Sequence, residues 1–305
     1  MAGTLLENVE RYTRLAGHNR MAMLLFRVGG EQLFAINVFK VREVLRRPPL
    51  ERMPKAHELL AGSCDYRGQT IPVIDLALAL GYPSLRDEPS AHLIVTEFSR
   101  SVQGFLVADP LRIVHCEGES MAAPAAALGF GSRVNGVTRV DGALIAVVDV
   151  EHVLASLDET PAVLSDSLQN VMAGRSSAPC RVLVADDSTV ARRKVVDFFR
   201  QMGIECVVAQ DGREALDRLL EMAEGPAGEG VGLVVSDIEM PRMDGYALTR
   251  AIRETPGLRS MKVLLHSSLS GVFNEALVRE VGADRFVAKF QPDVLARAVL
   301  ELFPD

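Results

Sequence analysis

The spacing of apolar residues changes near the middle of this chain, and that change limits the folds that the chain can adopt. Between residues 21 and 158, short apolar runs follow one another, and turn-forming residues separate them. From residue 181 onward, short apolar runs alternate with segments of helical period. We therefore predict an all-β domain followed by an α/β domain with a parallel sheet. The strands predicted in the α/β half are 182–185, 205–209, 232–236, 262–266 and 285–288.

The β-rich half contains hairpin signals and an internal repeat. Apolar runs flank Gly29-Gly30 and residues 99–101, and Asp141-Gly142 marks a third turn. The segments 62–75 and 136–149 share the pattern G-x5-G-x2-I-x-V-x-D. The paired positions are Gly62/Gly136, Gly68/Gly142, Ile71/Ile145, Val73/Val147 and Asp75/Asp149. We infer two similar β-subdomains in tandem, each a small curled or closed barrel. A chance similarity between two strands is the alternative.

The remaining segments set the expected domain boundaries. Residues 5–15 carry apolar side chains at helical spacing, which fits either plain packing or a partner site. Gly, Ser and Pro accumulate before residue 180, as in flexible linkers. We expect a helical segment at 1–20, the β domain at 21–158, a linker at 159–179 and the α/β domain at 180–305.

Charged and hydroxyl side chains gather at the strand ends of the α/β half. Asp186 and Asp187 end its first predicted strand, Asp237 ends the third, Ser267 the fourth and Lys289 the fifth. Because the carboxyl ends of parallel strands meet at one edge, we expect these side chains to share a crevice. Three carboxylates require charge compensation, which a hard divalent cation such as Mg²⁺ supplies together with the lysine.

This set of side chains suits phosphoryl transfer to a carboxylate. The predicted crevice has no histidine base paired with a serine, so it is poorly suited to hydrolysis of an ordinary substrate. Mg²⁺ and Lys289 would stabilise charge on the equatorial phosphoryl oxygens while Asp237 attacks in line.

Residues 181–305 resemble the response-regulator receiver domains. The resemblance rests on "ADD" at 185–187, on Asp237 followed by "MPRMDG", and on Ser267 and Lys289. It implies a doubly wound, flavodoxin-like fold and phosphorylation of Asp237. It further implies that Mg²⁺ is bound by Asp186, Asp187, Asp237 and the backbone carbonyl of Glu239, and that Ser267 and Lys289 contact the phosphoryl oxygens.

The chain departs from the usual receiver pattern at two positions. Ser267 replaces the commoner threonine, and Phe290 follows the lysine where a proline is usual. Phe286 stands where receivers carry a switch aromatic, and it is equally a core phenylalanine. Glu239 could either oppose an incoming water or help to position it, so the lifetime of the phosphate is open, although we expect autodephosphorylation.

The segment "CDYRGQTIPVIDL" in the β half resembles the CheW family of chemotaxis coupling proteins, whose fold is two β-barrel subdomains. Arg67 and Gly68 match the characteristic turn of that family. A β-turn with a solvated arginine is the alternative reading. The order of the two halves resembles the CheV-type coupling proteins, in which a CheW-like domain is fused to a receiver.

The CheV-type resemblance implies an adaptor that joins chemoreceptor tips to the histidine kinase CheA, with phosphorylation of Asp237 tuning the coupling. Other coupling proteins are further candidate partners. One alternative is a phosphate sink that drains the kinase without changing the scaffold. Another is a phosphatase with an aspartate nucleophile, but such sites resemble a DxD arrangement on the first strand, whereas Asp237 ends the third. We therefore expect a signalling adaptor whose receiver accepts phosphate from the kinase, and not an enzyme.

Composition excludes several other classes. The formal net charge of −7 argues against general binding to nucleic acid or to anionic membranes. No apolar run approaches the about 20 residues that cross a bilayer, and the four cysteines form no CxxC pair. We expect a cytoplasmic protein that is recruited to membrane-associated receptor arrays. Because the chain ends directly after the last predicted helix, we expect no DNA-binding domain.

Overall fold

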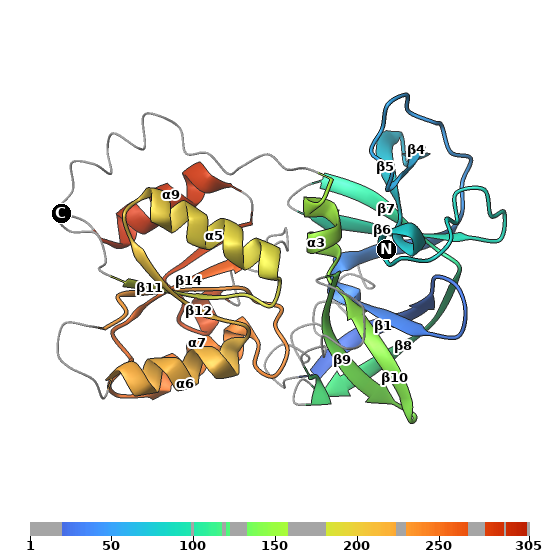
Figure 1. Cartoon of the computed structure of the whole chain (residues 1–305). Helices are drawn as coiled ribbons and strands as arrows, with labels where there is room; N and C mark the ends of the chain where they lie inside the picture. Colours follow the sequence, from blue (N-terminus) through green and yellow to red (C-terminus); the bar gives the residue numbers. More distant parts are fainter. Residues whose placement is uncertain are drawn as a thin grey trace. The chain divides into compact units, whose positions relative to one another are not determined.

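The structure is a computed structural model of the protein. It describes residues 20–98, 101–117, 120–122, 133–157, 181–223, 230–267, 278–289 and 291–303. These residues divide between two compact units, one within 21–159 and one within 160–305 (Figure 1). The helix predicted at 5–15, the linker predicted at 159–179 and Phe290 lie outside the described residues. No helix within the described ranges is both long enough and apolar enough to span a membrane.

Within its described residues, the first unit, called the coupling unit here, contains ten strands and three short helices. They are β1 (Arg20–Arg27), β2 (Leu33–Asn37), η1 (Val38–Lys40), β3 (Val41–Arg46), β4 (Leu60–Tyr66), β5 (Gln69–Asp75), α2 (Leu76–Ala79), β6 (His92–Phe98), β7 (Ser101–Val107), β8 (Asp109–Glu117), β9 (Val134–Val140), β10 (Ala143–Val148) and α3 (Val150–Ala155). The strands form two five-stranded sheets, with the orders β8-β1-β2-β10-β9 and β3-β6-β7-β5-β4. This all-β architecture confirms the predicted fold class.

The two sheets have the same design. In each, an antiparallel hairpin (β1-β2 or β6-β7) pairs in parallel with a strand of a second hairpin (β9-β10 or β4-β5). The prediction of subdomains in tandem is wrong, however, because the first sheet combines β1 and β2 with β8 to β10, and the whole second sheet lies between them in the sequence. The chain leaves the first sheet after β2, forms β3 to β7 in the second sheet, and returns with β8.

The internal repeat predicted from the sequence occupies equivalent places in the two sheets. Gly62 pairs with Val73 on β4-β5, and Gly136 pairs with Val147 on β9-β10. The last residue of each repeat caps the helix that follows. Asp75 accepts a hydrogen bond from the Leu78 amide, and Asp149 accepts one from the His152 amide. The shared pattern therefore encodes the same hairpin and helix start twice.

A buried ion pair joins the segments that follow two neighbouring strands of the first sheet. Lys40 lies in η1, directly after β2, and Glu151 lies in α3, after β10. The Nζ of Lys40 is 3.0 Å from Oε1 of Glu151, and the two side chains are 10% and 2% exposed. Removal of either charge would leave the other buried without this partner.

The second unit, called the receiver unit here, alternates strands and helices as predicted. Its elements are β11 (Arg181–Ala185), α5 (Thr189–Gln201), β12 (Glu205–Ala209), α6 (Gly212–Ala223), β13 (Leu233–Ser236), α7 (Gly245–Glu254), β14 (Lys262–Ser267), β15 (Arg285–Ala288) and α9 (Pro292–Leu302). All strand pairs are parallel, and the strand order is β12-β11-β13-β14-β15. This is the doubly wound order, in which the direction of winding reverses between β11 and β13.

Helices cover both faces of the receiver sheet. Figure 1 shows α5 and α9 on one side and α6 and α7 on the other. On the first side, Phe198 and Phe199 of α5 pack with Leu295 of α9 over the sheet. On the second side, Leu219 of α6 and Leu248 of α7 pack over the opposite face. Because both faces are buried at the central strands β11, β13 and β14, these strands are mostly apolar, and their charged side chains lie at or beside the strand ends.

Candidate functional site

Three aspartates meet at the point where the strand order of the receiver sheet reverses. Asp186 and Asp187 follow β11, and Asp237 follows the neighbouring strand β13. The register places these ends at one level, because Ala185 pairs with Ser236 and the Asp237 amide donates to the Ala185 carbonyl. One carboxylate oxygen from each aspartate lies within 4.8 Å of the others. The structure therefore brings the three predicted acids together.

Asp186, the first of the three acids, is positioned by the start of α5. Asp186 is 2% exposed, and its Oδ1 accepts a hydrogen bond from the Ser188 amide. Ser188 in turn caps α5 by accepting from the Ala191 amide. The guanidinium of Arg192 donates to the backbone carbonyl of Asp186. Asp186 is thus held at the sheet edge by the strand before it and the helix after it.

Asp237 is 3% exposed, and both of its carboxylate oxygens accept hydrogen bonds. Oδ1 accepts from the Ile238 amide at 2.6 Å and from the Glu239 amide at 3.4 Å. Oδ2 accepts from the ammonium of Lys289 at 2.7 Å. The carboxylate is therefore oriented by the turn that follows β13 and by a residue 52 positions further along the chain.

Lys289 is fully buried, with 0% relative exposure, and its ammonium lies between two of the aspartates. Its Nζ is 2.9 Å from Oδ2 of Asp186 and 2.7 Å from Oδ2 of Asp237. The Lys289 amide also donates to the carbonyl of Ser267, which places the end of β15 beside the end of β14. A charged lysine is stable at such depth only because carboxylates surround it.

The donor set fits a small divalent cation. Three carboxylates face one ammonium, which leaves negative charge in excess at a largely buried edge. One oxygen of each carboxylate lies within 4.8 Å of the others, so a single ion could contact all three. Mg²⁺ prefers such oxygen ligands and retains part of its hydration shell. Asp187, which is half-buried, leaves the group open to solvent on its side.

Two loops beside the acids are joined to each other. Asp211, which precedes α6, is buried and accepts hydrogen bonds from the Arg213 and Glu214 amides. The guanidinium of Arg242 forms an ion pair with the same carboxylate, and its Nε lies 2.6 Å from Oδ2. Arg242 has a φ of +59°, in the left-handed region that non-glycine residues seldom adopt. This ion pair anchors the loop between β13 and α7.

Gly245, the first residue of α7, packs directly on the backbone of the site. A Cβ at this position would lie 2.2 Å from the carbonyl oxygen of Asp237 and 3.0 Å from the Cα of Ile238. Both contacts involve backbone atoms, which cannot rotate away. The glycine of "MDG" is therefore required by the close approach of α7 to the end of β13.

Gly245→Ala is expected to lower the free energy of unfolding of the receiver unit by about 3 kcal/mol, because the methyl group forces backbone apart in a packed core. Amide hydrogen exchange in β13, measured on the full chain, would report the loss. The matched control is Gly257→Ala, where an added Cβ meets no atom within 4 Å. Equal protection of β13 in the two variants would contradict this reading of the contact.

The other residues predicted for the receiver site lie around this centre. Ser267 is fully buried at the end of β14 and pairs in register with Ala288. Glu239 is buried beside Tyr246, and burial together with the charges of Asp244 and Glu239 raises the pKa of the Tyr246 phenol. Phe286 is half-buried and packs against a separate apolar cluster. The members of that cluster are Ile238, Tyr246, Leu265, Val278 and Val281.

The predicted turn of the coupling unit has a defined geometry. Arg67 and Gly68 have φ values of +56° and +81°, which is the type I′ turn of a two-residue hairpin. The Arg67 guanidinium is 2.7 Å from Oε2 of Glu43, an oxygen that also accepts a hydrogen bond from the Tyr66 hydroxyl. The Tyr66 hydrogen bond, with Arg67 beside it, holds the pKa of Glu43 below its ordinary value. Arg67 is thus exposed but ion-paired, and it lies in the other unit from the acidic site.

The sequence analysis missed Asp211, Arg242 and Gly245 as parts of the site. Asp211 directly precedes the helical run at 212–223, and aspartate is a typical residue at that position. It could therefore have been found as a helix cap. Nothing in the sequence indicates the left-handed backbone of Arg242 or the close approach at Gly245, because both depend on tertiary packing.

Comparisons with known proteins match the two units to two families. Residues 22–158 match the family described as CheW-like domain, and residues 182–300 match the family described as response regulator receiver domain. The chemotaxis protein CheV1 of Helicobacter pylori is 28% identical, over 96% of this chain and 97% of its own length.

Two further similarities each cover one unit. Protein PilG of Pseudomonas aeruginosa is 32% identical over 39% of this chain and 84% of its own length. The crystal structure of the scaffolding protein TtCheW from Thermoanaerobacter tengcongensis is 22% identical, covers 43% of this chain and 84% of that chain, and has a TM-score of 0.40.

Proposed function

This chain belongs to the CheV-type chemotaxis coupling proteins, in which a CheW-like domain precedes a receiver domain, and from that premise we propose that it couples chemoreceptors to the histidine kinase CheA. Phosphorylation of Asp237 regulates the coupling. The observation that carries the regulatory half of this proposal is the contact of the fully buried Lys289 ammonium with Asp237, beside Asp186 and Asp187.

The chemistry proposed for Asp237 is phosphoryl transfer from a phosphohistidine of the kinase. A carboxylate oxygen of Asp237 attacks the phosphorus, a P–O bond forms, and the P–N bond breaks with its electron pair returning to the imidazole nitrogen. Lys289 places positive charge beside the acceptor carboxylate, and Ser267 lies at the adjoining strand end. Mg²⁺, held by Asp186, Asp187, Asp237 and the Glu239 carbonyl, would neutralise charge on the phosphoryl oxygens. Attack of water on the acyl phosphate would then return Asp237 to its carboxylate form.

Regulation requires that the receiver unit has two states that differ in their contacts. Phosphorylation adds charge at a site where Lys289 already bridges two carboxylates, so this buried network must rearrange. A rearrangement reaches the scaffold only if the kinase, the receptor or the coupling unit binds the two states differently. Phe286, half-buried on its own apolar cluster, is the candidate for the moving aromatic. The proposed location is the cytoplasm, at membrane-associated receptor arrays, with other coupling proteins as further partners.

Asp237→Asn is expected to abolish incorporation of phosphate from radiolabelled, phosphorylated CheA, because an amide oxygen is not a nucleophile for this step. Labelling of the wild-type chain should require Mg²⁺ and disappear when EDTA is added. The matched control is Asp217→Asn on α6, an exposed carboxylate outside the site, which should label as the wild type does.

Two results would contradict parts of the proposal. Labelling of Asp237→Asn at the wild-type level would show that another residue accepts the phosphate. Normal labelling combined with unchanged kinase activity in reconstituted receptor arrays would instead identify the receiver unit as a phosphate sink with no effect on coupling.

A further inference from the structure

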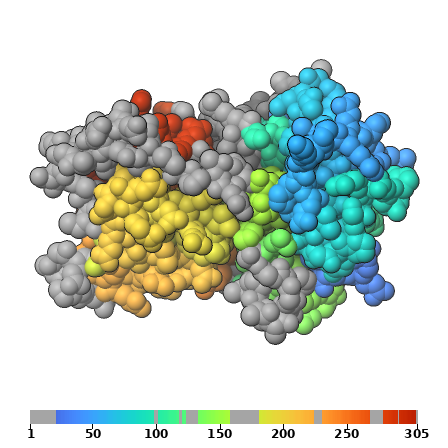
Figure 2. All heavy atoms as spheres, turned by 45° about the horizontal axis from the view of Figure 1, so that its top comes forward, coloured from blue at the N-terminus to red at the C-terminus, as the bar shows by residue number. Residues whose placement is uncertain are grey.

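A hollow on the surface of the coupling unit lies between the β3–β4 connection and the segment after α2. Its volume is about 430 Å³, and its lining includes the apolar side chains of Leu60, Ala61 and Leu78. Met53, which is 55% exposed, also lines it. The 50–60 segment, light blue on the colour bar, lies at the surface of this unit in Figure 2. Nothing in the proposed receiver chemistry uses this hollow.

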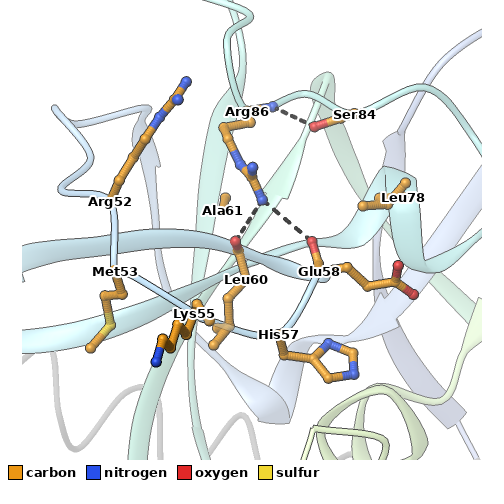
Figure 3. A pocket seen from close by; sticks show the side chains of 11 residues that line it. Arg52, Met53, Lys55, His57, Glu58, Leu60, Ala61, Leu78, Ser84 and Arg86 are labelled. Atoms are coloured by element: carbon orange, nitrogen blue, oxygen red, sulfur yellow. Dashed lines mark hydrogen bonds between the residues drawn. The ribbon is translucent and has the colours of Figure 1, made fainter.

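Hydrogen bonds hold the two sides of the hollow in place. Asp75 is fully buried, and its Oδ2 accepts from the Ser84 hydroxyl at 2.5 Å and from the Leu85 amide at 2.9 Å. Arg86 then reaches across to the β3–β4 connection, as Figure 3 shows. Its Nη2 donates to the carbonyl of Leu60 at 2.7 Å and to that of Glu58 at 3.3 Å. These hydrogen bonds fix the two sides of the hollow relative to each other, which lowers the ordering cost of binding.

The charged side chains in the lining are mostly cationic. The lining contains three cationic side chains, those of Arg52, Lys55 and Arg86, and one carboxylate, that of Glu58. The ion pair of Arg52 with Asp87 is 3.3 Å long and exposed on both sides, so it contributes little and exchanges readily. Lys55 forms no ion pair with any residue in the described ranges. A local excess of positive charge on a chain of net charge −7 favours an acidic partner.

We propose that this hollow binds a short acidic segment of a partner protein, which inserts one apolar side chain between Leu60, Leu78 and Met53. The carboxylates of that segment lie beside Arg52 and Lys55. The volume falls at the lower end of the about 300–1,000 Å³ typical of binding pockets, which suits one or two side chains. The unbranched side chain of Met53 adapts to apolar groups of different shape.

This inference rests on the proposed adaptor function in one respect: an adaptor binds proteins, so we take the partner in the hollow to be a protein. A free anion would use the cations but not the apolar part of the lining. A wholly apolar segment would leave Lys55 and Arg52 beside it without a counterion. The combination of both kinds of side chain in one hollow is what selects an acidic segment with an apolar anchor.

The test uses the full chain and a phage-displayed library of random twelve-residue peptides. Peptides selected on the wild type are expected to combine Asp or Glu with one Leu, Met or Phe. A synthetic peptide of the enriched sequence should bind the double variant Arg52→Glu/Lys55→Glu about tenfold or more weakly than the wild type. The matched control, Arg112→Glu on β8, reverses an exposed charge elsewhere in the same unit and should bind as the wild type does. Glu58→Gln, which removes the opposing carboxylate, should bind severalfold more tightly.

Several outcomes would overturn the proposal. These are the absence of enrichment, enriched peptides without acidic residues, and equal binding to the double variant. Equal binding of polyglutamate of the same length, or of the selected peptide with its apolar residue changed to Ser, would reduce the hollow to an anion-binding patch. Failure of Asp237 to accept phosphate would leave every one of these results unchanged, so the two proposals fail separately.

Discussion

Lys289→Met is expected to lower the free energy of unfolding of the receiver unit by about 3–5 kcal/mol in the presence of EDTA. The variant keeps the length of the side chain but removes the ammonium that lies 2.9 Å from Asp186 and 2.7 Å from Asp237. Both carboxylates are only 2–3% exposed in the wild type, so water would replace little of the lost charge compensation. Amide hydrogen exchange in β11 and β13 of the full chain would measure the loss.

Magnesium should partly restore the stability of Lys289→Met. A divalent cation between the aspartates replaces the missing positive charge, so Mg²⁺ should stabilise the variant more than it stabilises the wild type. The matched control is Lys262→Met in the same sheet, because the Lys262–Asp284 pair is 3.3 Å long and its lysine is 41% exposed. That control should cost less than about 1 kcal/mol. The same deficit in both variants, or no added effect of Mg²⁺, would argue against the charge balance described for the site.

The second large effect is expected in the coupling unit. Lys40→Met should destabilise it by about 3–5 kcal/mol, because the Glu151 carboxylate, 2% exposed, would stay buried without the Lys40 ammonium. The double variant Lys40→Met/Glu151→Leu should recover most of that loss, since apolar side chains of similar size replace the pair. Hydrogen exchange at the amides of β2 and β10 gives the free energies of all three proteins.

An exposed pair in the same unit gives the control for Lys40. Arg112 and Asp141 form an ion pair in which both side chains are more than 60% exposed. Arg112→Met should therefore change stability by less than about 1 kcal/mol. The Lys40→Met/Glu151→Leu double variant could instead be no more stable than Lys40→Met. The loss of stability would then come from altered packing of η1 and α3, and not from the unpaired carboxylate of Glu151.

The receiver half was predictable because its signals are local. Each strand is a short apolar run, and four of the five end in a charged or hydroxyl residue such as Asp186, Asp237 or Lys289. Parallel pairing then brings distant strand ends to one edge without further information. The Arg242–Asp211 tether and the contact of Gly245 with Asp237 were not predictable, because they depend on how two loops fold back on each other.

The coupling half was predictable in its hairpins but not in its connections. The turn at Asp141-Gly142 and the repeat of Gly62 and Gly136 gave the strand pairs and the number of sheets. The choice of sheet for β3 and β8 is not visible in the sequence, because an alternating strand pairs equally well with either neighbouring edge. The expectation of consecutive subdomains assumed the shorter connection, whereas the chain crosses between the sheets twice.

The chain passes from one sheet to the other at β3 and again at β8, and these two passages divide the unit into two equivalent halves. One copy of the repeated unit, β1 to β5 or β6 to β10, contains a hairpin for one sheet and three strands for the other. Alone, it could complete neither sheet and would expose unpaired edges. Two identical copies could complete both by exchanging strands, as in a domain-swapped homodimer. The coupling unit thus has the topology that joining the two chains of such a dimer end to end would give, and a half-length fragment is expected to fold only as a pair.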